Sequence, residues 1–142
     1  MERPYWLALL AETYGKVGQT REGLSVLAEA LAEVDTHGVH FCEAELHRLK
    51  GELLARSGAT PPEHTSEASQ AEACFLQALA IARRQQAKSW ELRAATSLAR
   101  LWQHQGKCAE AHELLAPIYG WFTEGFDTAD LQEAEELLQE LV

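Results

Sequence analysis

Four residues around one predicted turn have side chains that can bind metal: His37, His40, Cys42 and His47. A structural zinc site needs four ligands that converge at about 2.0–2.3 Å on a rigid frame. Two of the histidines fall in the turn, and the spacing of Cys42 and His47 directs their side chains to different sides of a helix. The pattern therefore favours polar turn and helix residues over a metal site.

A second candidate for chemistry is the pair Cys108 and His112, which share a helix face four positions apart. A catalytic cysteine also needs an oxyanion site and a group that orients the base, and the sequence indicates neither. The glycine–lysine pairs at residues 15–16 and 106–107 lack the upstream glycine of a phosphate-binding loop. We therefore expect no cofactor and no enzymatic activity, because no acid–base set is clustered.

The 142-residue chain carries a net charge of −10, concentrated at its C-terminal end. Residues 124–142 contain seven acids and no lysine or arginine, whereas the first 123 residues contain 15 acids and 12 bases. This charge repels a phosphate backbone, so nucleic acid is not an expected partner. We interpret the acidic end as the solvated face of a helix.

The remaining bulk features indicate a single cytoplasmic domain over residues 1–142. A stretch of about 18 apolar residues is missing, as is the apolar core of a secretory leader, so we expect no contact with a membrane. The three cysteines are dispersed and form no C-x-x-C, which suits thiols in a reducing compartment.

An internal repeat is the strongest structural signal. Gly18, Gly58 and Gly106 each end an apolar helical run. The residue four before each glycine is large and apolar: Tyr14, Leu54 and Trp102. One eight-residue insertion after Gly58 reconciles the spacings to a period of 40, which is typical of a helical solenoid.

The repeats predict helix pairs at about 4–37, 41–86 and 89–122, followed by a capping helix at about 129–141. In the first pair we expect helices over about 4–17 and from Thr20 to Val34, with a turn from Asp35 to His40. In the second pair, Gly51 lies inside a helix over 41–57 and indicates close approach by a neighbouring helix.

The later helices follow from capping and breaking signals. Ser69 and Glu72 form a capping box that predicts a helix from Ser69 to about Gln86. The third pair is expected over 89–105 and 107–122, with a kink at Pro117. The last helix has an apolar face that can cover the end of the stack: Leu131, Ala134, Leu138 and Leu141.

The aligned repeats resemble the tetratricopeptide family, although their period exceeds that family's standard 34 residues. The matching positions are Leu10, Ala11, Tyr14, Gly18, Gly23, Leu27 and Ala30, then Gly51, Leu54, Gly58, Ala71, Phe75 and Ala78, then Leu98, Ala99, Trp102, Gly106, Ala111, Leu115 and Ile118. The resemblance implies an all-α, right-handed α-solenoid of three tetratricopeptide-like helix pairs with a C-terminal capping helix.

Residues 71–107 and 114–138 also look like the C-terminal region of large bacterial predicted-ATPase proteins, many of which carry a class III adenylate/guanylate cyclase domain. The segment GWFTEGFDTADL is the most specific part of this likeness. It implies a regulatory or scaffold segment of a multidomain signalling ATPase or nucleotide cyclase. The implied partner is a protein or peptide, or another domain of the parent protein.

In tetratricopeptide arrays the first helix of each pair lines a concave groove. Those positions correspond here to ten candidate partner-binding residues: Tyr5, Glu12, Lys16, Glu45, Arg48, Glu52, Arg56, Arg93, Arg100 and His104. The four arginines can form paired hydrogen bonds with carboxylates of an acidic peptide, and a double reversal of Arg48 and Arg100 to glutamate should abolish binding. The alternative is a solvated face of mixed charge, with pairs such as Glu52–Arg56.

The aromatic residues Trp121, Phe122 and Phe126 are expected to pack against the final helix. If they do not, they form an apolar patch that suits a partner or a second copy of the chain. The second functional hypothesis is therefore a structural segment that forms a homo-oligomer through this patch.

Overall fold

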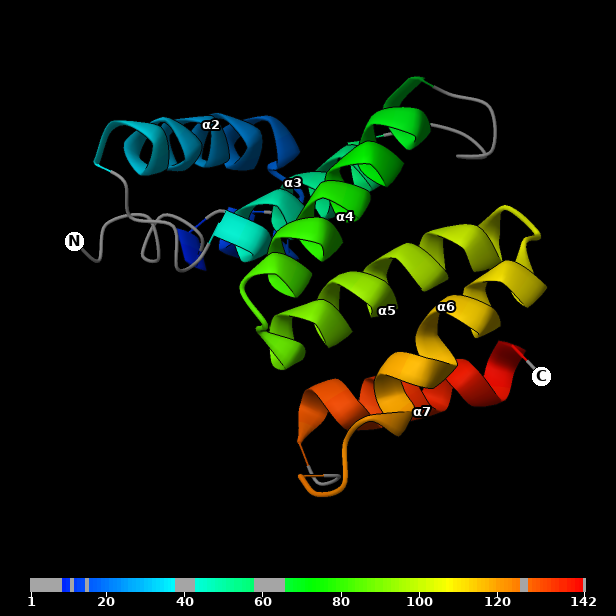
Figure 1. The fold of residues 1–142 in the computed structure, drawn as a ribbon. Helices are drawn as coiled ribbons and strands as arrows, with labels where there is room; N and C mark the ends of the chain where they lie inside the picture. Colours follow the sequence, from blue (N-terminus) through cyan, green and yellow to red (C-terminus); the bar gives the residue numbers. More distant parts are fainter. Residues whose placement is uncertain are drawn as a thin grey trace.

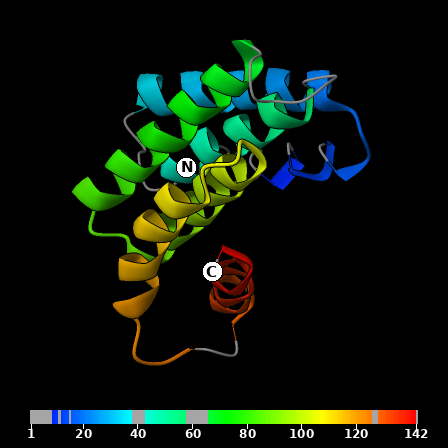
Figure 2. The ribbon, with the colours of Figure 1, turned by 90° about the vertical axis from the view of Figure 1, so that its right-hand side faces the viewer.

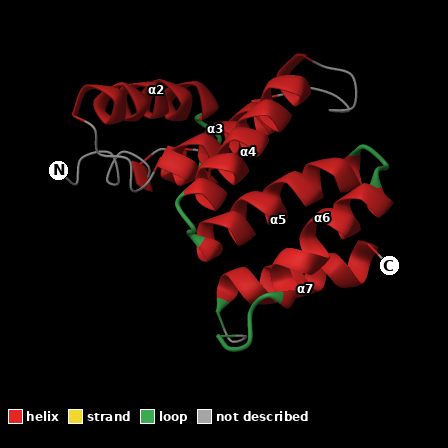
Figure 3. Cartoon of the chain, viewed as in Figure 1, coloured by secondary structure: helices red, strands yellow, loops and turns green. Residues whose placement is uncertain are grey.

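The computed structural model describes residues 9–10, 12–14, 16–37, 43–57, 66–125 and 128–141. Within these ranges all regular structure is helical, and Figure 3 accordingly draws helices and loops but no strand. Residues 9–10, 12–14 and 16 are helical, and the longer helices are α2 (Thr20–His37), α3 (Glu43–Ser57), α4 (Ser66–Arg84), α5 (Lys88–His104), α6 (Cys108–Gly120) and α7 (Ala129–Leu141). The predicted all-α class is confirmed. None of the described helices combines the length and the hydropathy that crossing a bilayer requires.

Most helix bounds agree with the sequence, and α7 begins and ends at the predicted residues. The predicted turn at Asp35 is wrong, because α2 continues to His37 with no glycine or proline to stop it before Gly38. The predicted start of α4 at Ser69 is also wrong, since the helix begins at Ser66. The helix-compatible residues between the last proline and the capping box extend α4 by one turn.

Left-handed residues end several of the described helices. Gly18 has φ +83° and Gly106 has φ +81°, as expected for the predicted glycine stops. The Lys107 N–H donates to the Trp102 carbonyl at 2.8 Å, and the corresponding bond forms at the Gly18 turn. The α4–α5 turn makes the same bond with Gln86 in the left-handed position, at φ 56°.

The helices pack in chain order, and α3 also packs on α5 and α5 on α7. In Figure 1 they follow one another from α2 at the upper left to α7 at the lower right. Figure 2, turned by 90°, again places α2 and α7 on opposite sides of the helices between them. The alternate helices α3, α5 and α7 therefore form a contiguous layer.

Apolar clusters fill the spaces between successive helices. Leu27 and Leu46 belong to the cluster that joins α2 to α3, and Phe75 and Leu98 to the cluster that joins α4 to α5. A third cluster joins α4, α5, α6 and α7. Its members from α7 are Leu131, Ala134, Leu137 and Leu141. The last helix therefore covers α5 and α6 as predicted, although the sequence placed the partly buried Leu138 where Leu137 is buried.

Gly51 lies against the ring of Phe75, as its position inside a helix predicts. A Cβ atom at residue 51 would lie 2.6 Å from Phe75 Cε1, so only glycine permits this approach of α3 and α4. The large repeat positions Leu54 and Trp102 are half-buried. Trp102 packs between two clusters, and its Nε1 donates to Glu72 Oε1 at 2.6 Å.

Candidate interaction surface

A cavity of about 210 Å³ lies between the N-terminal helical residues and helices α3, α5 and α7. Six of the ten residues predicted from the sequence line it: Glu12, Lys16, Arg48, Glu52, Arg93 and Arg100. Glu133, Leu49 and Leu53 complete the lining. We call the polar surface around this cavity the inner face, which comprises Glu12, Lys16, Glu45, Arg48, Glu52, Arg93, Ser97, Arg100, Asp130 and Glu133.

The other predicted residues differ in where they lie. Glu45 joins the inner face through ion pairs with Arg48 and Arg93. His104 lines a neighbouring cavity rather than this one. Tyr5 and the side chain of Arg56 lie outside the described residues.

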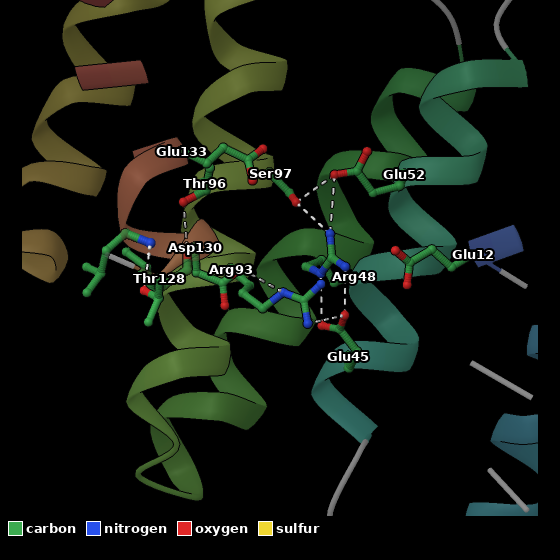
Figure 4. A network of polar contacts seen from close by, with 12 residues as sticks. Glu12, Glu45, Arg48, Glu52, Arg93, Thr96, Ser97, Thr128, Asp130 and Glu133 are labelled. Atoms are coloured by element: carbon green, nitrogen blue, oxygen red, sulfur yellow. Dashed lines mark hydrogen bonds and ion pairs between the residues drawn. The ribbon is translucent and has the colours of Figure 1, made fainter. Parts of the chain in front are cut away.

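Arg48 lies at the centre of the inner face (Figure 4). Its Nε and Nη2 atoms donate to the two carboxylate oxygens of Glu45, at 2.9 and 2.6 Å. Its Nη1 atom donates to Ser97 Oγ at 3.3 Å and lies 3.5 Å from Glu52 Oε1. Ser97 Oγ donates to the same Glu52 oxygen at 2.7 Å, so one network joins α3 to α5.

This network is largely removed from water. The side chain of Arg48 is 11% exposed and that of Glu45 is 10% exposed. Burial lowers the pKa of Arg48, but the hydrogen bond and attraction of Glu45, with the attraction of Glu52, outweigh burial and raise it above its ordinary value. Arg48 therefore remains charged and holds two helices together, instead of presenting its guanidinium to an incoming carboxylate.

Arg93 extends the network to the last helix. Its Nη1 atom lies 2.9 Å from Glu45 Oε1, and its Nε atom lies 3.6 Å from Asp130 Oδ1. The carboxylate of Glu45 thus receives two guanidinium groups, which compensates the cost of burying it. One arginine side chain connects α3, α5 and α7 (Figure 4).

Two further ion pairs lie at the solvent side of the inner face. Arg100 Nη1 is 2.5 Å from Glu133 Oε1, with the side chains 41% and 47% exposed. Lys16 Nζ is 3.5 Å from Glu12 Oε1, with the lysine side chain 70% exposed. Exposed pairs contribute only about 0–1 kcal/mol, so Arg100 and Lys16 can exchange these partners for others at low cost.

The inner face is nearly balanced in charge, with four cations and five carboxylates. Its cations are Lys16, Arg48, Arg93 and Arg100, and its carboxylates are Glu12, Glu45, Glu52, Asp130 and Glu133. Every one of these cations has a carboxylate within 4.0 Å. The described arginines therefore already pair with carboxylates of the chain itself, and binding of an acidic peptide by these arginines stays a prediction.

Three members of the inner face were not predicted from the sequence: Ser97, Asp130 and Glu133. The two acids lie on α7, where the acidic composition suggested only a solvated helix face. The signal that could have identified them is position, because α7 packs on α5 as α5 packs on α3, so that charged residues of α7 can reach the arginines of α5. Ser97 lies one helical turn from both Arg93 and Arg100 on α5.

The other candidate chemistry has little support among the described side chains. They contain no group of three histidine, cysteine, aspartate or glutamate residues that could hold a metal, but His40, Cys42 and the side chain of His37 lie outside the described residues, so the set predicted from the sequence is not tested. Cys108 is partly buried and packs against the core. Burial raises the pKa of Cys74, which disfavours a reactive thiolate there.

Trp121 does not pack as predicted. Its side chain is 57% exposed, whereas Phe122 is half-buried and packs on the core that α7 completes. The two rings meet edge-on with centroids 5.2 Å apart, and Lys88 Nζ lies 5.2 Å from the Trp121 ring centroid. Trp121 follows the last residue of α6, Gly120, and Phe126 lies outside the described residues.

Comparisons with protein-family models, with curated proteins and with solved structures find no match to this chain. The likeness to tetratricopeptide proteins and to ATPase-linked regulators therefore rests on the residues quoted from the sequence.

Proposed function

We propose that the chain is a protein-interaction module, built as a right-handed stack of three tetratricopeptide-like helix pairs with α7 as the cap. The packing of α3 on α5 and of α5 on α7 supports this arrangement, because in such a stack the first helix of each pair contacts the next one. The polar outer side of α7, with its exposed acids, suits a terminal repeat that faces water.

The observation that carries the proposal is the inner face itself. Charged side chains from α3, α5 and α7 converge there around a cavity that remains open, although a purely structural interface would close it with apolar residues. The exposed pairs at its solvent side can be exchanged for pairs with a partner. Recognition of a protein or peptide uses such a surface, and we propose no catalytic step for it.

From the sequence likeness, we further propose that this module belongs to a larger cytoplasmic signalling ATPase or nucleotide cyclase. In that setting, the inner face would bind either a separate protein or another domain of the same chain. The binding event would then report to, or be controlled by, the nucleotide-dependent domains.

The test is a pull-down with two charge-reversed variants. Lys16→Glu with Arg100→Glu reverses the two exposed cations of the inner face. Arg84→Glu with Lys107→Glu makes the same change in charge at exposed positions elsewhere. We expect a partner retained by the wild type and by the control pair to be lost with the inner-face pair. Equal retention by both variants would reject the proposal. The Arg48 reversal suggested by the sequence is unsuitable, because a buried glutamate there would unfold the network.

A second candidate function, self-association, is favoured by the exposure of Trp121. The ring lies beside an open cavity of about 580 Å³ that Arg83, Gln86, Lys88 and Glu91 also line. Exposed tryptophans frequently anchor protein interfaces. Sedimentation of the wild type and of Trp121→Ser over a range of concentrations tests this function. A wild-type mass independent of concentration would remove self-association from consideration.

A further inference from the structure

A second cavity of about 210 Å³ opens beside the inner face, toward the C-terminal ends of α3 and α5. We call it the anchor cavity, and its lining consists of Glu52, Ala55, Phe75, Ser97, Arg100, Leu101 and His104. It shares Glu52 and Arg100 with the cavity of the inner face, so the two are continuous. A chain segment that follows the inner face would therefore reach the anchor cavity.

The floor of the anchor cavity is apolar and firmly held. Phe75 is 1% exposed and Leu101 is 5% exposed, and both belong to the cluster between α4 and α5. The Phe75 ring also packs closely against Gly51 of α3. An apolar cavity of roughly 150 Å³ suffices to hold a benzene ring, so this one has room for a large apolar side chain.

The rim of the anchor cavity is polar, and its residues differ in how many of their hydrogen-bonding atoms already have partners. Glu52 is already engaged by Ser97 and Arg48. Arg100, in contrast, uses only Nη1 in its contacts with other described residues, in the exposed pair with Glu133. His104 is exposed and lies one turn beyond Arg100 on the same side of α5. The remaining donors of Arg100 therefore point to a carboxylate as the group that completes the rim.

We propose that the anchor cavity binds a short motif in a partner protein, which consists of one large apolar side chain and a neighbouring carboxylate. The apolar side chain occupies the space over Phe75 and Leu101, and the carboxylate pairs with Arg100 beside His104. This inference deepens the proposed function and rests on it. The cavity is smaller than the roughly 300–1,000 Å³ of sites for drug-sized molecules, and its continuity with the inner face favours a peptide chain as the occupant.

The test is selection of a phage library of random dodecapeptides against the wild-type protein. Enriched peptides are then measured against three variants. Ala55→Phe fills the cavity from α3, Arg100→Gln removes the charge at its rim, and Arg84→Gln makes the same exchange at an exposed site on α4. Circular dichroism establishes that each variant is folded, and the exposed Arg100→Gln and Arg84→Gln variants decide the result if Ala55→Phe does not fold.

We expect enriched peptides to share a leucine, methionine or aromatic residue next to an aspartate or glutamate. Their affinity should fall about ten-fold or more with Ala55→Phe and about three- to ten-fold with Arg100→Gln, and should not change with Arg84→Gln. Peptides that lack the motif, or that bind the variants as well as the wild type, would overturn the anchor cavity but leave the interaction function intact. Failure to enrich any binding peptide would contradict the interaction function as well.

Discussion

Replacement of Arg48 or of Arg100 by methionine separates a structural arginine from an exposed one on the same surface. Both changes remove one positive charge and keep a long, flexible side chain. The Arg48 side chain is 11% exposed and contacts Glu45, Glu52 and Ser97. The Arg100 side chain is 41% exposed, and its ion pair among the described residues is with Glu133.

The expected losses of stability follow from these environments. Removal of one partner from a buried ion pair costs about 3–5 kcal/mol, because the remaining charge stays buried without compensation. Arg93 still lies 2.9 Å from Glu45 in the Arg48→Met variant, so we expect a loss near the lower end, about 3 kcal/mol. An exposed pair contributes about 0–1 kcal/mol, and we expect a loss below about 1 kcal/mol for Arg100→Met.

Urea unfolding followed by circular dichroism measures both free energies of unfolding in the same buffer. Because the described helices pack mainly on their neighbours, the slopes of the two transitions should also be compared with that of the wild type. Equal losses of stability for the two variants, or a larger loss for Arg100→Met, would refute the assignment of Arg48 as a buried residue that joins α3 to α5.

Three further predictions concern the backbone, the packing and the thiols. Gln86 holds a left-handed conformation at φ 56°, which glycine adopts without strain. Gln86→Gly should therefore raise the free energy of unfolding by about 0.5–1 kcal/mol. A loss of stability would show that contacts of the Gln86 side chain outweigh the relief of backbone strain. Gly51→Ala gains about 1 kcal/mol in helix propensity but forces its Cβ against the buried Phe75 ring at a cost of about 1–3 kcal/mol. We expect a net loss of about 1 kcal/mol in thermal unfolding, and an increase in stability would mean that the ring moves aside easily. Cys108 should react with a maleimide before Cys74, because burial raises the pKa of the Cys74 thiol and keeps it protonated at pH 7. Raising the pH to about 9.5 should therefore speed the labelling of Cys74. Faster labelling of Cys74 at pH 7 would contradict its burial.

Much of the helical framework can be predicted from residues that start or stop helices. The left-handed glycines at positions 18 and 106 and the bounds of α7 follow from local residue preferences, which neighbouring helices do not override here. The close contact at Gly51 is predictable for a similar reason, since an unfavourable residue inside a helix requires a compensating contact.

The burial of the charged residues and the identity of their ion-pair partners could not be predicted in the same way. Spacing places Arg48, Arg93 and Arg100 on one side of their helices, but only the packing of α5 on α3 and α7 decides which of them is buried. The exposure of Trp121 could not be predicted either, because it lies directly after the end of α6, and the exact end of a helix lies beyond local sequence signals.

Recognition through the inner face is tested most directly by site-specific photo-crosslinking in the full chain. A benzophenone amino acid replaces Lys16, which is 70% exposed at the inner face, or Leu76, which is 46% exposed on α4 away from both cavities. We predict that a partner that binds the wild-type chain is crosslinked from position 16 and not from position 76. Crosslinking from position 76 alone, or with equal yield from both, would contradict the assignment of the inner face as the binding surface.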